Sequence, residues 1–297
     1  MTIKLGLIGL SEGNGHPYSW SAICNGYSFD EMESCGFPVI PRYLEEQTWP
    51  DDSISGASVT HVWTQNTELS KKIAKTVHIP NVVENYMDMI NQVDAVLLAR
   101  DDTDTHYELA SPFLKAGLPV YIDKPIALSV EELNRLYELE QYPGQIFTCS
   151  ALGYAKEYKL TKADYESIGK ILHVHAMIPK DWEKYGVHII EPVLRIIGDQ
   201  GTIVRSQVWR NNDHVNVNLL WASGMQTSFS TFGDASSPLN IRIIGDTGWK
   251  DLIFKDTFNA FKAALSDFIC GAEKRDVRSD PLLIRKIVEI IEIGRRE

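Results

Sequence analysis

The sequence predicts two folded parts: an α/β part built on a doubly wound parallel sheet, and an α+β part built on an open antiparallel sheet. In the first half, short apolar runs alternate with stretches typical of helices, the order expected of parallel strands joined by helices. From Lys170 onward apolar and polar residues alternate, as along half-buried antiparallel strands. We place the change of domain at residue 150, with residues 1–150 in the first domain and 151–297 in the second.

Composition excludes several classes of partner. The chain has 297 residues, of which 44% are hydrophobic and 23% charged, enough to bury a core. The formal net charge of -11 argues against nucleic acid or an anionic membrane as the main partner. We see no membrane span and no signal peptide. The four cysteines are scattered without C-x-x-C spacing, so we expect a cytoplasmic protein without a metal site.

The strands of the first domain are predicted from apolar runs of the length typical of buried strands. These runs are residues 3–10, 59–63, 94–99, 120–122 and 145–150. Helices are expected at residues 18–23, 67–77, 86–91, 106–115 and 129–140. Residues 25–57 lack clear periodicity but are too aromatic to be disordered. We interpret them as a folded insertion with one short helix.

A glycine-rich turn between the first strand and the first helix predicts a phosphate-binding site. Its candidate residues are Gly9, Ser11, Gly13, Asn14 and Gly15. Glycines let the backbone approach phosphates, and the start of the following helix offers N–H groups to them. The spacing departs from G-x-G-x-x-G because Ser11 takes the place of the second glycine. A flexible turn without a nucleotide is the alternative interpretation.

Two further loops follow strands of the predicted sheet. The second strand leads into Thr64-Gln65-Asn66, which contains neither the acid expected for a ribose diol nor an arginine for an NADP phosphate. The sequence therefore leaves NAD and NADP open. Asp101 and His106 follow the third long strand and are candidate cofactor contacts. A lone histidine at a helix start is also typical of capping or packing.

Lys124 lies where a strand gives way to a helix. The run Val120–Ile122 must end at Asp123-Lys124-Pro125, because proline has no N–H for the sheet. Ser129 then provides a helix cap. Ligands of open parallel sheets bind at this edge, so Lys124 is a candidate site residue. The alternative is a solvated loop lysine.

The second domain is predicted from alternating residues and three helical stretches. Strands are expected at residues 172–178, 202–209, 215–221, 225–232 and 239–244. Helices are expected at residues 185–197, 258–271 and 281–296. The last helix presents an apolar face at helical spacing.

Three motifs together resemble a known family. The stretch from His106 through Ala116-Gly117 to Asp123-Lys124-Pro125 is similar to an H…AG..V..EKP.A signature. Residues 186–191, followed by Gly198, are similar to G.H..D……G, and residues 245–248 to a G..G turn. On these motifs the chain resembles, over nearly its whole length, the Gfo/Idh/MocA oxidoreductases, which include glucose–fructose oxidoreductase and inositol dehydrogenase.

The resemblance implies a Rossmann domain that binds NAD or NADP, and an open sheet that mediates homodimer or homotetramer contact. It implies that Lys124 and Pro125 lie at the cofactor, with a peptide bond between them that is often cis. Lys124 would bind the substrate oxygen and stabilise its developing charge. His188 would be the acid–base group, since histidine titrates near neutral pH.

Two positions depart from the family pattern. Asp123 replaces the glutamate of EKP, and Lys184 replaces an aspartate one helical turn before the histidine. A second cation would favour the neutral forms of His188 and Lys124, or bind an acidic group of the substrate. Lys184 and the neighbouring Tyr185, a potential proton donor, are therefore candidate catalytic residues. A solvent-facing helix lysine is the alternative for Lys184.

These observations predict an NAD(P)-dependent oxidoreductase that transfers hydride to or from a sugar or sugar-like substrate. One alternative is a catalytically inactive sensor or scaffold of the same fold that binds the cofactor or a sugar. A second alternative is a reductase of imine or pyrrole-type double bonds, which needs less of the sugar-type catalytic set.

Overall fold

The computed structural model describes residues 2–296, which form two compact units. Unit 1 comprises residues 2–126, 134–148 and 261–280. Unit 2 comprises residues 127–133, 149–260 and 281–296. The segment 261–280, which the sequence interpretation placed with the second domain, thus belongs to unit 1. Within residues 2–296, no helix is long and apolar enough to cross a membrane.

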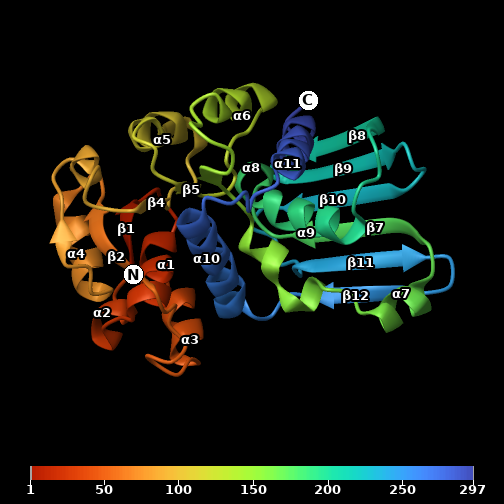
Figure 1. Cartoon of the computed structure of the whole chain (residues 1–297). Coiled ribbons are helices and arrows are strands. Elements are labelled where there is room, and N and C mark those ends of the chain that lie inside the picture. Colours follow the sequence, from red (N-terminus) through yellow and green to blue (C-terminus); the bar gives the residue numbers. More distant parts are fainter. Residues whose placement is uncertain (1, 297) are drawn as a thin grey trace. The chain divides into compact units, whose positions relative to one another are not determined.

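Unit 1 is built on a parallel sheet whose strand order is β3-β2-β1-β4-β5-β6 (Figure 1). The strands are β1 (Ile3–Ile8), β2 (Ala57–Trp63), β3 (Asn81–Val82), β4 (Ala95–Leu98), β5 (Val120–Ile122) and β6 (Ile146–Phe147). The predicted doubly wound α/β sheet is confirmed. β3 was not predicted, because two residues are too few to show a period. The order reverses between β2 and β4 around β1, which makes the end of β1 the ligand-binding crevice of such sheets.

Helices connect these strands. They are α1 (His16–Asn25), α2 (Phe29–Glu33), α3 (Val39–Glu45), α4 (Thr67–Thr76), η1 (Tyr86–Met89), η2 (Thr103–Thr105) and α5 (His106–Lys115). Two more, α6 (Val130–Tyr137) and α10 (Thr257–Lys274), begin in unit 2 and end in unit 1. The expectation of one short helix in the insertion was wrong, since residues 25–57 form α2 and α3. Both are shorter than the window in which a helical period can be recognised.

The insertion packs on the start of α1. A Cβ atom added to Gly15 would lie 2.5 Å from Cδ1 of Ile40 and 2.9 Å from Cγ of Phe37. The ring of Phe37 also lies 6.1 Å, between centroids, from the ring of Tyr18 on α1. Residues 25–57 are therefore part of the packing that fixes the glycine-rich turn.

We expect Gly15→Ala to destabilise the protein by about 1–3 kcal/mol, the usual cost of overpacking. The added methyl group must displace Ile40 or Phe37, both held by the insertion. Urea denaturation measures the change. The control is Glu12→Ala in the same turn, at an exposed side chain, which should stay within about 0.5 kcal/mol of wild type. An unchanged urea midpoint for Gly15→Ala would show that the insertion rearranges without a cost in stability.

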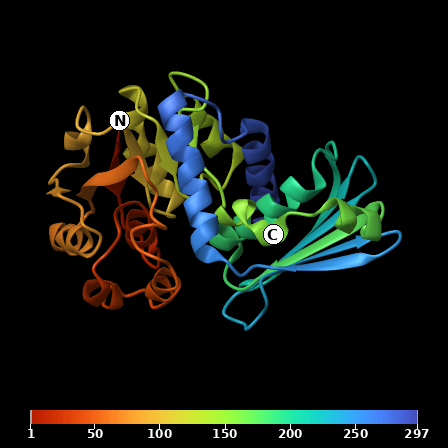
Figure 2. The same ribbon diagram turned by 60° about the horizontal axis from the view of Figure 1, so that its bottom comes forward.

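A helix close to the C-terminus completes the core of unit 1. Phe268 on α10, the long blue helix in Figure 2, contacts Tyr121 and Phe147 at ring-centroid distances of 5.5 and 5.6 Å. Ser279 Oγ donates to the carbonyl of Thr148 at 2.6 Å and accepts from its N–H at 2.9 Å. Segments more than a hundred residues apart thus share one buried core.

Unit 2 is built on a six-stranded sheet of order β12-β11-β7-β10-β9-β8. The strands are β7 (Ile171–Ile178), β8 (Ile203–Asn211), β9 (His214–Trp221), β10 (Gln226–Phe232), β11 (Asn240–Gly245) and β12 (Trp249–Ile253). The predicted antiparallel sheet is corrected in one pair, because β7 and β10 run parallel. The chain between them passes through two helices and a hairpin, so β10 returns in the direction of β7. The other pairs are antiparallel.

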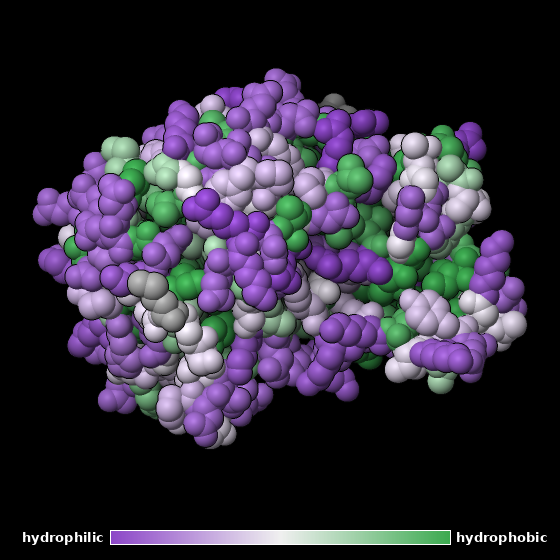
Figure 3. All heavy atoms as spheres, in the orientation of Figure 1, coloured by the Kyte–Doolittle hydropathy of each residue, from purple (hydrophilic) through white to green (hydrophobic). Residues whose placement is uncertain are grey.

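One face of this sheet is covered and the other is open. The remaining helices are η3 (Ala151–Tyr154), η4 (Lys156–Tyr158), α7 (Lys162–Ile168), α8 (Trp182–Tyr185), α9 (Val187–Ile197) and α11 (Pro281–Gly294). Val174, Ala176 and Ile178 are buried on the face that α9 covers, whereas Trp209 and Trp249 are exposed. Figure 3 shows hydrophilic and hydrophobic side chains intermingled on the surface facing the viewer.

Candidate functional site

The glycine-rich turn leaves several backbone donors without a protein acceptor. Among residues 2–296, none accepts a hydrogen bond from the N–H groups of Glu12, Gly13 or Gly15. Gly13 has a φ of 77°, which glycine adopts readily, and nothing lies within 4 Å of its absent side chain. These donors precede α1, whose first turn adds the positive end of a helix dipole. The turn can therefore bind an anionic group such as a phosphate.

A buried carboxylate ties this turn to the end of β5. The Asp123 side chain is 1% exposed and accepts from Asn14 Nδ2 at 2.7 Å, from His16 Nδ1 at 2.6 Å and from the N–H of Lys124 at 2.7 Å. Burial raises the pKa of this carboxyl, but the charge and hydrogen bond of His16, the charge of Lys124 and the amide of Asn14 lower it to about 2. Asp123 is thus a permanent negative charge at neutral pH.

Lys124 meets residues from two other loops. Its Nζ lies 3.8 Å from Oδ2 of Asp101, and its side chain is 7% exposed. Ser11 Oγ donates to Oδ1 of Asp101 at 2.7 Å and accepts from the Asp101 N–H at 3.0 Å. The Lys124–Pro125 peptide bond is cis, as the resemblance implied. The structure therefore brings together four predicted site residues, Ser11, Asn14, Asp101 and Lys124, because β1, β4 and β5 are neighbours that end at one edge.

Three other candidates are held by packing. The imidazole of His106 is fully buried, with ring nitrogens 2.8 Å from the carbonyl oxygen of Arg100 and 3.0 Å from that of Ile126. These contacts support the packing alternative for His106. Position 9 requires a glycine because Pro17 packs closely against its backbone: a Cβ atom there would lie 2.5 Å from Pro17 Cγ. Pro125 is buried next to Lys124.

Side chains at the end of β2 make contacts that the sequence did not reveal. The amide of Gln65 accepts from the N–H of Leu10 at 3.2 Å and donates to its carbonyl at 2.8 Å. Arg100 Nη1 donates to Gln65 Oε1 at 3.0 Å and also pairs with Asp102. Gln65 and Arg100 thus stand where an acid for a ribose diol would be expected, and both are already engaged by neighbouring groups of unit 1.

A network of hydrogen bonds in unit 2 orients His188. Its Nδ1 lies 2.8 Å from Ser150 Oγ. The N–H of Ser150 donates to Glu191 Oε2 at 2.5 Å, and Arg195 donates to Glu191 Oε1 from Nε at 3.0 Å and from Nη2 at 2.8 Å. The absence of a side chain at Gly153 leaves room for the Glu191–Arg195 pair, because a Cβ there would lie 2.8 Å from both Arg195 Nε and Glu191 Oε1. The network fixes the orientation of the His188 ring.

Two more candidates precede His188. Lys184 and Tyr185 end α8, which begins with a cap in which Asp181 accepts from the Lys184 N–H at 2.8 Å. The rings of Tyr185 and His188 lie 5.7 Å apart. Unit 2 therefore brings Tyr185 next to His188, and Lys184 is half-buried rather than fully exposed to solvent.

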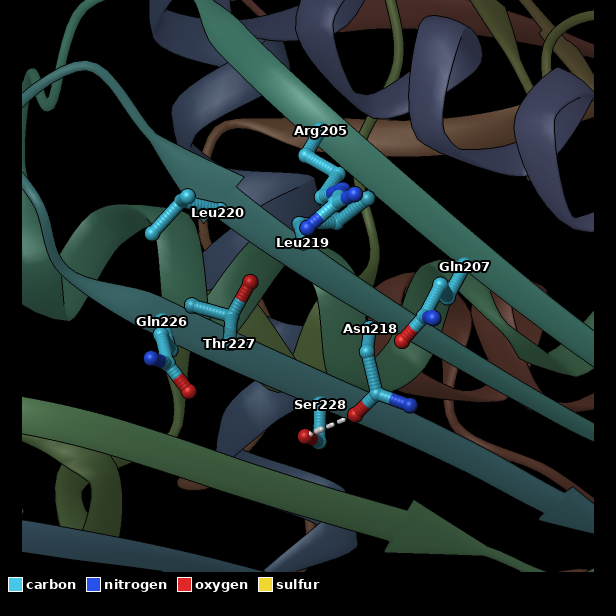
Figure 4. Close-up of a pocket in the computed structure, with 8 residues that line it drawn as sticks. All are labelled: Arg205, Gln207, Asn218, Leu219, Leu220, Gln226, Thr227 and Ser228. Carbon is cyan, nitrogen blue, oxygen red and sulfur yellow. Dashed lines mark hydrogen bonds between the residues drawn. The ribbon is translucent and has the colours of Figure 1, made fainter.

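The open face of the unit 2 sheet carries a polar hollow of about 200 Å³ (Figure 4). It is lined by Arg205, Gln207, Asn218, Leu219, Leu220, Gln226, Thr227 and Ser228. Ser228 donates to Asn218, and Asn216 donates to Ser230 Oγ at 2.8 Å on the same face. Of the lining side chains, Ser228 and Asn218 are thus bonded to each other within the sheet. In the described part of the chain, no cluster of three or more His, Cys, Asp or Glu side chains could hold a metal ion.

The fold and the turn of unit 1 are of the doubly wound α/β class in which nucleotides are commonly bound. Residues 43–150 match the family model described as "Oxidoreductase family, NAD-binding Rossmann fold". This segment is therefore similar to the NAD-binding part of the Gfo/Idh/MocA oxidoreductases.

Similarity to individual proteins extends the comparison. YceM of Salmonella typhimurium is 28% identical over 85 residues, which cover 29% of this chain and 27% of YceM. Myo-inositol 2-dehydrogenase from Lactobacillus plantarum has a TM-score of 0.73 at 16% identity, covering 98% of this chain and 96% of that one. UDP-N-acetylglucosamine 3-dehydrogenase GnnA from Acidithiobacillus ferrooxidans has a TM-score of 0.72 at 14% identity, covering 99% and 97%. At these identities the two structures establish a shared fold.

Proposed function

We propose that this protein is an NAD(P)-dependent oxidoreductase that transfers hydride to or from a sugar or sugar-like substrate. The observation that carries the proposal is Lys124, a buried cation at the carboxyl end of β5, on the same sheet edge as a turn with N–H donors open to a phosphate. The match of residues 43–150 to a family model with an NAD-binding Rossmann fold supports it. The names of two structural relatives, dehydrogenases of inositol and of UDP-N-acetylglucosamine, support the substrate class.

The proposed roles follow from the chemistry of each side chain. A bound nicotinamide would supply or accept the hydride. Lys124 binds the substrate oxygen and stabilises negative charge that develops there. His188 takes or returns the hydroxyl proton. Because a serine hydroxyl can donate or accept, Ser150 can remain bonded to Nδ1 in both protonation states of the ring.

The proposal extends to neighbouring groups and to assembly. Tyr185, beside the His188 ring, is a second proton donor, and Lys184 binds an acidic group of the substrate. Copies of the chain associate through the outer face of the unit 2 sheet into a homodimer or homotetramer. The exposed side chains of Trp209 and Trp249 on this face support the proposal. The enzyme would act in the cytoplasm.

Fluorescence titration with NADH and NADPH tests cofactor binding and determines which is preferred. Turnover is then measured with NAD⁺ or NADP⁺ and a panel of inositols, hexoses and nucleotide sugars, and with NADH or NADPH and the corresponding ketoses. Binding of one dinucleotide and turnover of one substrate are expected. Failure of both dinucleotides to bind would refute the oxidoreductase.

Ser150→Ala is expected to lower turnover about 2- to 10-fold, the loss of one hydrogen bond worth about 0.5–1.5 kcal/mol. The imidazole of His188 then loses the hydroxyl that orients it. The pH profile of turnover and the ¹⁵N shifts of His188 distinguish lost orientation from a general loss of structure. Ser167→Ala, at an exposed serine of unit 2, is the control. A pH profile and ¹⁵N shifts identical to wild type would contradict the role of Ser150.

One observation favours a second candidate function, a sensor that binds a cofactor or sugar without turnover. The end of β2 lacks the usual acid, and Gln65 already occupies both backbone groups of Leu10. A sensor would bind a dinucleotide in the fluorescence titration yet turn over no substrate of the panel.

A further inference from the structure

The first turn of α1 lacks the free N–H donors that helix starts usually offer to a phosphate. The N–H of His16 donates to Oδ1 of Asn14 at 2.8 Å. Pro17 has no N–H. The N–H groups of Tyr18 and Ser19 both donate to one carbonyl group of the preceding turn, at 3.1 Å. The open donors therefore lie in the turn before the helix, and α1 itself can add only a side chain to them.

The imidazole of His16 is fixed beside this turn. Its Nδ1 and the Nδ2 of Asn14 lie 2.6 and 2.7 Å from the same atom, Oδ2 of Asp123. The indole of Trp20 stacks on the imidazole at 4.9 Å between centroids, and the ring of Phe261 meets it edge-on at 5.1 Å. These contacts hold the ring on three sides and next to residue 14 of the turn.

The second ring nitrogen of His16 stays open. Its Nε2 makes no hydrogen bond within residues 2–296. The side chain is 17% exposed, and Nε2 is open to solvent, unlike the hydroxyl groups of Tyr18 and Ser19 on the same helix, which are enclosed. A ligand at the surface of the turn can therefore reach this nitrogen.

The charge on Asp123 determines what Nε2 can do. This carboxyl is ionised at neutral pH, because its pKa is lowered to about 2, so it can only accept and Nδ1 of His16 carries a proton. The neutral ring then presents Nε2 as an acceptor, whereas the protonated ring presents it as a cationic donor. Asp123 is the charged group at the ring and Lys124 acts on Asp123 in turn, while Trp20 and Phe261 are uncharged.

We propose that His16 is a ligand of the cofactor, donating from Nε2 of its protonated imidazole to the diphosphate of the dinucleotide. It acts beside the N–H groups of Glu12, Gly13 and Gly15, which have no acceptor among residues 2–296. The inference rests on the proposed function, which supplies the dinucleotide. Hydrogen bonds between a cation and a phosphate are about twice as strong as neutral ones. Affinity for the dinucleotide therefore falls as the pH rises and His16 loses its proton.

The test is isothermal titration calorimetry of the full chain with NAD⁺ and NADP⁺ between about pH 6 and pH 8.5, the range in which histidine titrates. The affinity for the preferred dinucleotide should fall about tenfold across this range, the effect of losing one hydrogen bond to a charged group. His16→Asn keeps an N–H for Asp123 but has no Nε2. It should bind about tenfold more weakly at pH 6 and show no dependence on pH.

Two further variants separate this role from a loss of structure. His16→Gln can place an uncharged donor near the position of Nε2, and should recover part of the affinity without its dependence on pH. His78→Asn is the control, because His78 is an exposed histidine of unit 1 whose φ of 56° asparagine adopts readily. It should bind as wild type does at each pH.

Inorganic diphosphate provides a measurement that does not need the dinucleotide. The NMR titration of the His16 ring, followed by ¹⁵N shifts, should move to higher pH when diphosphate is added. Dinucleotide binding that does not change with pH, or that His16→Asn leaves intact, would overturn the role of His16 and leave the proposed function standing. If neither dinucleotide binds, the proposed function fails, and an unmoved titration of His16 with diphosphate would then overturn this inference as well.

Discussion

Lys124→Met is expected to lower turnover about 10²- to 10³-fold, the effect of removing one group that stabilises charge in the transition state. Methionine preserves most of the volume of this buried side chain, so the loss should reflect the ammonium group. Steady-state kinetics with the substrate found in the panel measures the change. Binding of the preferred dinucleotide should largely survive, because the N–H donors of the glycine-rich turn are untouched.

Two variants accompany this measurement. Lys115→Met removes an exposed lysine from α5 and should leave turnover unchanged. Lys124→Arg keeps the charge but changes its shape, and should recover only part of the activity, because a planar guanidinium does not replace a point charge. Full turnover in Lys124→Met would disprove the role of this residue in the reaction.

Asp123→Ala is expected to lower the free energy of unfolding by about 3–5 kcal/mol, the cost of removing one partner from a buried charged pair. Asn14, His16 and the N–H of Lys124 all lose their acceptor. Urea denaturation measures the change. Asp104→Ala, at an exposed position two residues before His106, should stay within about 0.5 kcal/mol of wild type. A loss equal to that control would show that the cluster contributes nothing.

The same carboxylate predicts how stability depends on pH. Its pKa is lowered from 3.8 to about 2 in the folded protein, so the folded state favours the charged form. The resulting stabilisation, about 2 kcal/mol, is fully present well above pH 4 and is lost as the pH falls from about 4 to 2. Unfolding free energies measured across this range should fall more steeply for wild type than for Asp123→Asn. Parallel curves would contradict the assignment.

Much of the fold could be predicted because its long elements have a clear period. The parallel sheet follows from apolar runs separated by helices, and β7 from the alternation of Val174, Ala176 and Ile178. β3 was missed because two residues show no period, and β12 because charged residues interrupt its apolar ones. The parallel direction of β10 depends on the whole path of the chain, which local patterns do not contain.

The sequence could predict which loops form the candidate site, but not the hydrogen bonds between their side chains. Residues that follow neighbouring parallel strands must lie near each other, which is why the sequence could place the candidates Ser11, Asp101 and Lys124 at one edge of the sheet. The bond between His16 and Asp123 joins residues 107 positions apart. The bond between Gln65 and Leu10 joins residues 55 apart. Both depend on the directions of side chains in turns, which have no repeating pattern to reveal them.

The late position of α10 in the chain has a consequence for protein synthesis. Phe268 and Ser279 complete a core whose other members, Tyr121 and Thr148, leave the ribosome more than a hundred residues earlier. A nascent chain of about 150 residues therefore contains all strands of the unit 1 sheet but lacks α10, so the apolar side chains that α10 covers are exposed. Such a chain would need a chaperone or rapid synthesis of the remaining residues. A recombinant nucleotide-binding fragment that ends at residue 150 should accordingly collect in inclusion bodies, and attaching residues 261–280 through a linker should return it to the supernatant.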